Sequence, residues 1–353
     1  MNDLYLIGNG FDLAHGLKTS YNDFLLWYLK ESIELTNSNH YFKDNLIEID
    51  GNASWLMRGD YSSIRNILRN FLESNIRIQY KHTFFKNIVE NYRDYRWVDV
   101  EYEYYMALVE IYGDMEKTNV LRSDFHFGRV NPLNVCFDFI MKKLVEYLRT
   151  IEITSNLENR RIETILIEGT GPERNGKGEK LFVNFNYTKT LEFYTKKNFP
   201  AKNNLINIHG ELDNSSNPII FGYGDEMDPH YGKIENLNNN AFLKNIKSFG
   251  YFRTNNYRRV LSFIEGDNNE FTVKILGHSC GLSDRILLNT IFEHPNCKAI
   301  KIYYYQKSEM ENDYFEKTQE ISRHFKATGK GNMRTKIVAF EESVPLVPLN
   351  TKS

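Results

Sequence analysis

Polar residues and glycines follow five of the strands that the sequence predicts, at the point where each strand ends. They are Gly8-Asn9-Gly10, Asn186-Tyr187-Thr188, His209-Gly210, residues 222–225, and residues 277–281 with Asp284 just beyond. In open parallel sheets, ligands bind in the crevice beyond the carboxyl ends of the strands. Glycines leave room for a ligand against the backbone, while amide and imidazole side chains supply hydrogen bonds. Together the five clusters predict a cleft of nucleotide size.

The first cluster follows a short apolar run at residues 4–7. Glycine there allows a close approach to the backbone, and a helix that starts next can hold a phosphate on its free N–H groups. The spacing is G-x-G followed, after five residues, by Gly16, which matches neither the G-x-G-x-x-G fingerprint nor a P-loop. A phosphate-binding turn and a plain tight turn therefore both remain open.

Asn186 and His209 are the candidates for catalysis. A histidine with a pKa near neutrality can accept a proton from water, and an asparagine amide can form hydrogen bonds with a ligand or with that water. Each residue also has a plain structural interpretation: Asn186 as a helix cap and His209 as a hydrogen-bonded structural histidine. Asp12 or Asp225 can stabilise a developing positive charge, or can simply cap a helix.

Asp99 and Glu101 lie two residues apart in the segment that begins at Trp97. On a strand they would share one face and could bind a metal, as a nuclease requires. On a helix, Asp99 would be the N-cap and Glu101 would lie in the first turn, where the helix dipole favours a negative charge. We favour the helix start.

The elements that position these residues alternate between strands and helices in the last part of the chain. The predicted strands are 181–185, 205–209, 218–222, 271–277, 299–305 and 336–340, and helical patterns cover 281–294 and 309–325. Such alternation predicts an α/β fold with a mostly parallel sheet and helices on both faces. We expect the strand at 4–7 to join this sheet.

Domain boundaries follow from where the pattern changes. Residues 1–30 and 156–345 form the predicted core, 31–60 a polar loop, 61–155 an all-helical insertion, and 346–353 a tail. Apolar residues recur at helical spacing through the insertion, as at Ile64, Ile67 and Leu68.

Composition limits the partners and the compartment. The chain has 44 lysines and arginines against 46 aspartates and glutamates, so its charge gives no argument for nucleic acid or a membrane as a partner. The three cysteines form no C-x-x-C pair and fit a reducing compartment. No apolar run is long enough to span a membrane or to be a signal peptide. We therefore expect a cytoplasmic protein.

Several of these motifs, in the same order over most of the chain, resemble the AbiH family of bacteriophage abortive-infection proteins. They are LYLIGNGFDLAHGLKTSYNDF from residue 4, WVDVE from 97, VNFNYTKTLEFY from 183, INIHGELDN from 206, PIIFGYGDE from 218 and ILGHSCGLSD from 275. This family is similar to the sirtuin-like superfamily of NAD-binding Rossmann proteins, which implies a Rossmann-like core.

Four sirtuin motifs have counterparts here. The glycine loop is matched by the spacing of Gly8, Gly10 and Gly16, the ribose-binding asparagine by Asn186, and the histidine general base by His209. A closing G-x-S turn is matched at residues 277–279. The resemblance thus implies that NAD is bound as a substrate by Gly8, Asn9, Gly10, Phe11, Asp12, Gly16, Tyr187, Gly277, Ser279 and Asp284.

The departures narrow the implied activity. Thr188 replaces the aspartate of the sirtuin motif, Lys18-Thr19-Ser20-Tyr21 replaces Pro-Asp-Phe-Arg, and the four-cysteine zinc module is missing from the sequence. Lysine deacylation is therefore not expected. Phage-defence relatives of sirtuins also lack that module and hydrolyse NAD to ADP-ribose and nicotinamide.

The resemblance implies an antiphage effector that hydrolyses NAD when triggered, with Asn186 and His209 as catalytic residues and no metal. A phage-derived trigger or a partner defence protein, and a homo-oligomer, are the expected partners. Two alternatives stay open. One is a metal-dependent nuclease-type toxin that uses Asp99 and Glu101, two residues that, with Asp225, are otherwise the candidate accessory residues of the NAD site. The other is a non-catalytic nucleotide-binding sensor. The balanced charge disfavours a nuclease with a large basic footprint.

Overall fold

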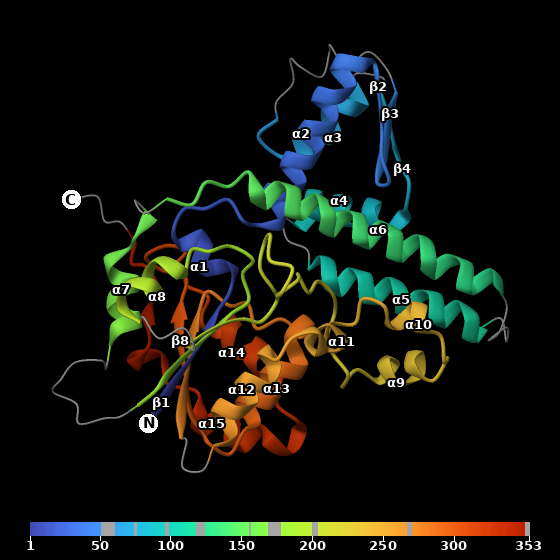
Figure 1. The fold of residues 1–353 in the computed structure, drawn as a ribbon. Coiled ribbons are helices and arrows are strands. Elements are labelled where there is room, and N and C mark those ends of the chain that lie inside the picture. Colours follow the sequence, from blue (N-terminus) through green and yellow to red (C-terminus); the bar gives the residue numbers. More distant parts are fainter. Residues whose placement is uncertain are drawn as a thin grey trace. The chain divides into compact units, whose positions relative to one another are not determined.

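The structure is a computed structural model. It describes residues 1–50, 61–73, 76–95, 99–117, 124–154, 157–168, 178–199, 204–266 and 270–349. The chain divides into two compact units, each built from separate segments (Figure 1). Unit 1 comprises Met1–Lys18, Glu152–Met227 and Lys247–Ser353, and unit 2 comprises Thr19–Ile151 and Asp228–Ile246.

Unit 1 contains a six-stranded sheet in which every neighbouring pair of strands is parallel. The strands are β1 (Asn2–Ile7), β5 (Lys180–Asn184), β6 (Leu205–Asn207), β7 (Phe271–Leu276), β8 (Cys297–Tyr304) and β9 (Val344–Pro345). Their order is β6-β5-β1-β7-β8-β9, so the first strand lies in the middle of the sheet. The prediction that the first strand joins a mostly parallel sheet is confirmed.

Alternate residues of β1 point to opposite faces of the sheet, as the period of a strand requires. Leu4 and Leu6 enter one apolar core, and Tyr5 and Ile7 enter the other. A strand buried on both faces reads as a continuous apolar run, which explains why residues 4–7 show no polar alternation.

Helices cover both faces of this sheet (Figure 1). On the face of Tyr5 lie α1 (Asn9–Ala14), α7 (Arg160–Ile167) and α8 (Glu192–Asn198). On the face of Leu4 lie α12 (Asn256–Glu265), α13 (Arg285–Glu293) and α14 (Tyr314–Arg323). The helices α11 (Lys247–Gly250) and α15 (Lys330–Lys336) also belong to this unit. The expected covering of the sheet by helices on both faces is therefore confirmed.

Two predicted strands are wrong. Residues 218–222 form a loop that folds back on the end of β6, where the Ile220 N–H donates to the His209 carbonyl at 2.8 Å without a continuing ladder. Residues 336–340 make one bridge to the sheet, between Ile337 and Ile300, and the carbonyl of Val338 accepts from the Tyr314 hydroxyl at 2.6 Å. The edge of the sheet is β9 instead.

Unit 2 is mainly helical but is not all helix. Its helices are α2 (Tyr21–Asn39), α3 (Ile64–Glu73), α4 (Thr83–Tyr95), α5 (Val100–Lys117), α6 (Asp124–Arg149), α9 (Pro229–Glu235) and α10 (Asn240–Leu243). A three-stranded antiparallel sheet contains β2 (Tyr41–Lys43), β3 (Ile47–Asp50) and β4 (Arg77–Tyr80). The last of these interrupts the insertion that was expected to be helical at 61–155.

The expected loop at 31–60 is also wrong in its described part. Helix α2 continues to Asn39 because Ser20 caps it, accepting from the Asp23 N–H at 3.1 Å, and its buried face extends to Thr36. Strands β2 and β3 follow, and their short length hides them in a polar sequence. Residues 51–60 lie outside the described residues, as do residues 350–353 of the expected tail.

Residues 228–246 belong to unit 2, although the sequence alone assigned them to the core. They are held there by hydrogen bonds to α5 and α6. The Tyr105 hydroxyl donates to Asp228 at 2.8 Å, and the Asn134 amide donates to the Ala241 carbonyl at 2.8 Å. The chain thus leaves unit 1 after Met227 and returns at Lys247.

Candidate functional site

The turns after β1 and β7 pack backbone against backbone. The Gly8 N–H donates to the Leu276 carbonyl at 3.2 Å, and the Gly10 N–H donates to the Gly277 carbonyl at 2.8 Å. A Cβ at Gly10 would lie 2.8 Å from the Gly277 Cα, and one at Gly277 would lie 2.1 Å from the Phe11 nitrogen. Gly277 also has a φ of +71°, which favours glycine. Close packing therefore accounts for these glycines.

The same contacts occupy the N–H groups that would hold a phosphate. Those of Gly8 and Gly10 are engaged as above, and that of Phe11 donates to the Gly8 carbonyl at 2.8 Å. Asn9 lies exposed at this turn. Gly16 has a φ of +77°, and a Cβ there would meet no described atom within 4 Å, so its backbone conformation alone explains the glycine. Nucleotide binding by these residues stays a prediction.

Asn186 connects the end of β5 to the end of β1. Its amide donates to the Gly8 carbonyl at 3.0 Å. The Asn184 side chain forms hydrogen bonds with both backbone groups of Asn186: its amide donates to the carbonyl, and its Oδ1 accepts from the N–H. The N-cap of α8 is Leu191 with no side-chain bond, so the cap interpretation of Asn186 does not hold for that helix. Tyr187 donates its hydroxyl to the Ile220 carbonyl at 3.1 Å.

Asp12 is buried on α1, with 1% of its surface exposed. The Thr188 hydroxyl donates to its Oδ2 at 2.5 Å, while its Oδ1 has no hydrogen-bond partner among the described residues. Burial raises the pKa of Asp12 from 3.8 to about 6, although the Thr188 hydroxyl acts in the opposite direction. The pKa of Asp12 therefore lies above the ordinary range of an aspartate.

Asp12→Asn is expected to change the pH dependence of stability. Because the folded pKa of about 6 exceeds the unfolded value of 3.8, the wild type loses stability as pH rises through that window. A shift of this size corresponds to about 3 kcal/mol. Relative to wild type, the variant should gain that amount as the pH rises through the same window, measured by denaturant unfolding. A difference that does not vary with pH would contradict the assignment.

Asp284 is the centre of a buried cluster of titratable groups. Its Oδ1 lies 2.8 Å from the Lys247 Nζ and 3.0 Å from the His209 Nε2, and its Oδ2 lies 3.5 Å from the His278 Nε2. The side chains of Lys247, His209, His278 and Asp284 are 0, 7, 3 and 8% exposed. Residues from three segments of the chain thus meet at the carboxylate of Asp284, which the resemblance had assigned to nucleotide binding.

The cluster holds Asp284 charged and His209 uncharged. Burial acts to raise the pKa of Asp284, but the Lys247 ammonium and His209 offset it, so this pKa lies well below its ordinary value. Burial, together with the Lys247 charge, lowers the pKa of His209. Because a carboxylate faces Nε2, the favoured neutral tautomer of His209 carries its proton there and leaves Nδ1 as the proton acceptor.

A second layer of contacts fixes the turn after β7. The His278 Nδ1 accepts from the Cys280 N–H at 2.9 Å, so its other ring nitrogen carries the proton that faces Asp284. The His324 Nε2 lies 2.8 Å from the Cys280 carbonyl, and Cys280 has a φ of +58°. The Phe185 ring packs at 5.1 Å from that of His209 and at 4.1 Å from that of His278. Ser279, by contrast, is exposed.

The buried Asp225 forms an ion pair with Arg285, the residue that follows Asp284 in the sequence, whose side chain is partly exposed. Its Oδ2 accepts from the Arg285 guanidinium at 2.8 Å, and its Oδ1 accepts from the Met227 N–H at 2.9 Å. Both carboxylate oxygens are therefore engaged in binding the protein's own groups, which is the structural rather than the catalytic interpretation of this residue.

Asp99 and Glu101 lie in unit 2, at the start of α5. The Asp99 Oδ1 accepts from the N–H groups of Glu101 and Tyr102, each at 3.0 Å, so Asp99 is the N-cap of the helix. Glu101 is buried in the first turn. The helix-start interpretation is thus confirmed, while Trp97 lies outside the described residues.

Sequence reasoning missed Lys247 and His278. His278 stands inside a motif that had been interpreted as a turn, and its neighbours Gly277 and Ser279 were chosen instead. Lys247 follows a segment that also contains Lys244, and no spacing distinguishes one lysine from the other. In the structure, the side chain of Lys244 is 49% exposed and that of Lys247 is fully buried.

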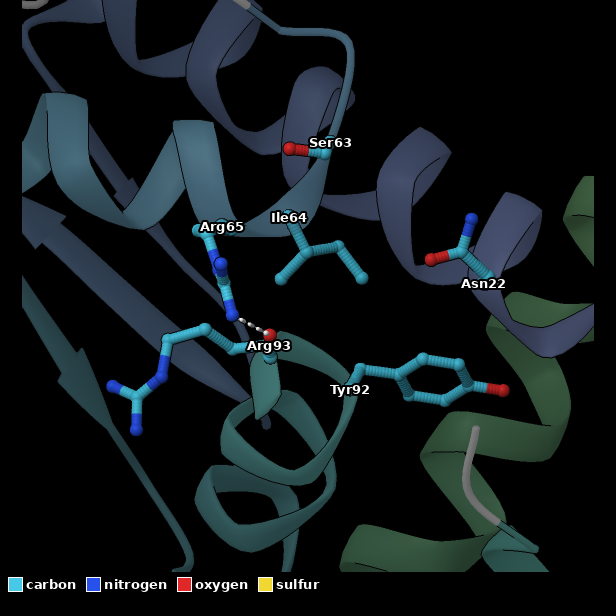
Figure 2. A pocket seen from close by; sticks show the side chains of 6 residues that line it. All are labelled: Asn22, Ser63, Ile64, Arg65, Tyr92 and Arg93. Carbon is cyan, nitrogen blue, oxygen red and sulfur yellow. Dashed lines mark hydrogen bonds between the residues drawn. The ribbon is translucent and has the colours of Figure 1, made fainter. Parts of the chain in front are cut away.

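Two cavities contain none of the predicted site residues. One in unit 2 has a volume of about 430 Å³ and is lined by Asn22, Ser63, Ile64, Arg65, Tyr92 and Arg93 (Figure 2). The Arg65 guanidinium donates to the Arg93 carbonyl at 3.3 Å, a hydrogen bond drawn as a dashed line in Figure 2. The other, in unit 1, has about 270 Å³ and involves Phe325 and Lys326. In the described part of the chain, no helix is long and apolar enough to cross a membrane.

The fold and the site define an α/β protein with a central parallel sheet and a buried His-Asp-Lys cluster beyond its strand ends. The family model described as bacteriophage abortive infection AbiH matches residues 4–306. The chain therefore belongs to the AbiH family, and membership suggests a role in abortive infection by phage. Searches of curated proteins and of solved structures give no match.

Proposed function

We propose that this AbiH protein is an antiphage effector that hydrolyses NAD to ADP-ribose and nicotinamide when phage infection triggers it. The observation that carries the proposal is the buried, uncharged imidazole of His209, which lies beside the Asp284 carboxylate beyond the end of β6. A buried histidine of lowered pKa, paired with a carboxylate, is the arrangement that a general base needs.

The order of the strands supports a dinucleotide as the substrate. Numbered within their own sheet, the strands run 3-2-1-4-5-6, which is the order of dinucleotide-binding Rossmann folds. In such sheets the ligand lies where the order reverses, which here is between β1 and β7. Gly8, Gly277 and His278 follow those two strands. The resemblance of the glycine loop to that of sirtuin-like proteins points in the same direction.

The proposed reaction breaks the bond between the ribose C1′ and the nicotinamide nitrogen. The bonding electron pair leaves with nicotinamide, and an oxocarbenium-like state develops on the ribose. Water adds to C1′ and loses its proton to the His209 Nδ1. Asn186, held by the Gly8 carbonyl, orients the ribose or the water. Because the N–H groups of Gly8 and Gly10 are engaged, the pyrophosphate requires other donors or a movement of this turn.

The alternatives receive less support. Asp99 is engaged as a helix cap, so the extended geometry that a nuclease site would need is not the one this segment adopts. A nucleotide sensor would use the same cleft without catalysis, and the buried base is the observation that favours the enzyme over the sensor.

Incubation of the purified protein with NAD tests the proposal. Chromatography should resolve nicotinamide and ADP-ribose in equal amounts. Because a trigger is part of the proposal, NAD is also measured in infected cells that express the protein, where it should fall before lysis. Binding of NAD without loss in either setting would identify a sensor, and neither binding nor loss would contradict the assignment of NAD.

A further inference from the structure

Lys247 is a fully buried lysine at the first position of α11. Its Nζ lies 2.8 Å from the Asp284 Oδ1, and the exposed fraction of its side chain is 0%. Its backbone is anchored as well, because its N–H donates to the Tyr223 carbonyl at 2.9 Å. Lysine is almost never fully buried unless it is paired, so this position is built around the contact with Asp284.

The oxygen that Lys247 contacts is the one that faces His209. The His209 Nε2 lies 3.0 Å from the same Oδ1, which is within ion-pair distance, yet it makes no hydrogen bond of good geometry among the described residues. His278 faces the other oxygen at 3.5 Å. One negative charge is thus shared by three groups that can carry a positive charge, and Lys247 has the shortest contact.

We propose that Lys247 is a positioning residue. Its ammonium balances the negative charge of Asp284 and thereby keeps His209 uncharged and able to accept a proton. The role as a base rests on the proposed function, whereas the effect of Lys247 on the charge of His209 does not. Asp284 stays ionised when it is paired with Lys247, so its carboxylate still orients the His209 imidazole. The negative charge of that carboxylate is already balanced by the ammonium.

The groups that face this cluster give the direction of the effect. Burial opposes the protonation of His209 most strongly, and the facing Lys247 and His278 oppose it too. The facing Asp284 carboxylate favours the protonation of His209. Asp284 also interacts with the buried His324, on the chain after α14, and with Cys280. Without the ammonium, an unbalanced buried carboxylate would lie against two histidines, and His209 would bind a proton more readily.

The test compares Lys247→Gln, which keeps a hydrogen-bond donor but removes the charge, with Lys247→Arg, which keeps the charge. Lys244→Gln is the matched control, because Lys244 is exposed on the same stretch of chain. Histidine side chains are labelled, the His209 signal is assigned with His209→Gln, and its titration is followed by NMR without NAD. In Lys247→Gln the midpoint should rise by about one pH unit or more. In Lys247→Arg and in Lys244→Gln it should stay near the wild-type value.

Activity provides a second readout. The acidic limb of the pH–rate profile should move upward in Lys247→Gln and return in Lys247→Arg, whereas loss of a merely structural contact would lower the rate without moving that limb. An unchanged His209 midpoint in folded Lys247→Gln protein would overturn the proposal. If that variant does not fold, a wild-type midpoint at or above the ordinary histidine range would overturn it. A shifted midpoint in a protein that hydrolyses NAD neither when purified nor in infected cells would reject the proposed function alone.

Discussion

His209→Gln is expected to lower the rate of NAD hydrolysis at least about 100-fold, the usual effect of removing a general base. Glutamine keeps most of the volume and a polar group, but it cannot accept the proton of water. Burial lowers the pKa of His209, so the wild-type rate should stay constant until the pH falls below the ordinary histidine range. Product formation by the purified variant, followed by chromatography, measures the effect.

His230→Gln is the control for this result, because His230 is exposed on α9. It should leave the rate unchanged.

Asn186→Ala should also abolish NAD loss and toxicity while the protein stays folded, since the amide that reaches the Gly8 carbonyl at 3.0 Å is removed. Normal kinetics in either folded site variant would show that the sirtuin-like role does not apply to that residue.

Gly277→Ala is expected to destabilise unit 1 by about 3 kcal/mol or more, which places it among the most damaging single substitutions. The new Cβ would lie 2.1 Å from the Phe11 nitrogen and 2.4 Å from the Gly10 carbonyl carbon. Both neighbours are backbone atoms, so no side-chain rotation relieves the contact. A φ of +71° adds strain for alanine. Denaturant unfolding and the melting temperature measure the loss.

Gly113→Ala is the matched control. Gly113 lies inside α5, and a methyl group added there would meet no described atom within 4 Å, so alanine should stabilise that helix by roughly 0.5–1 kcal/mol. If Gly277→Ala were as stable as wild type but lost only nucleotide binding, the glycine would exist for the ligand. Unfolding with binding intact in the folded fraction would show that backbone packing is its main role.

The sheet was predictable because its central strands are buried on both faces. Residues 4–7 and 271–276 appear as mainly apolar runs, and the polar clusters after them appear as breaks. From parallel strands alone it followed that His209 and the turn at 277 lie at one edge of the sheet. Burial of Asp12 and its contact with Thr188 did not follow, because they depend on side-chain packing.

The failures have local physical causes. Strand β4 has four residues, too few for a pattern to exceed chance, and its neighbours in the sequence are helices. Residues 218–222 resemble a strand because they are apolar, and Ile220 does pack in the core. They form a loop that returns across the end of β6 instead. Lys247 could not be predicted because the sequence does not distinguish a buried lysine from an exposed one. Only the position of Asp284 in the fold distinguishes them.

The central position of β1 has a consequence for the synthesis of the protein. The ion pair between Asp3 and Lys274 joins residues 271 positions apart, and β1 borders both β5 and β7. At ordinary rates of translation, on the order of tens of seconds separate the emergence of β1 from that of β7. During that interval the first strand has no partner on one side, and Asp284 has not yet been made. A chain whose synthesis stops before this point therefore lacks Asp284, and with it the carboxylate at the centre of the buried cluster.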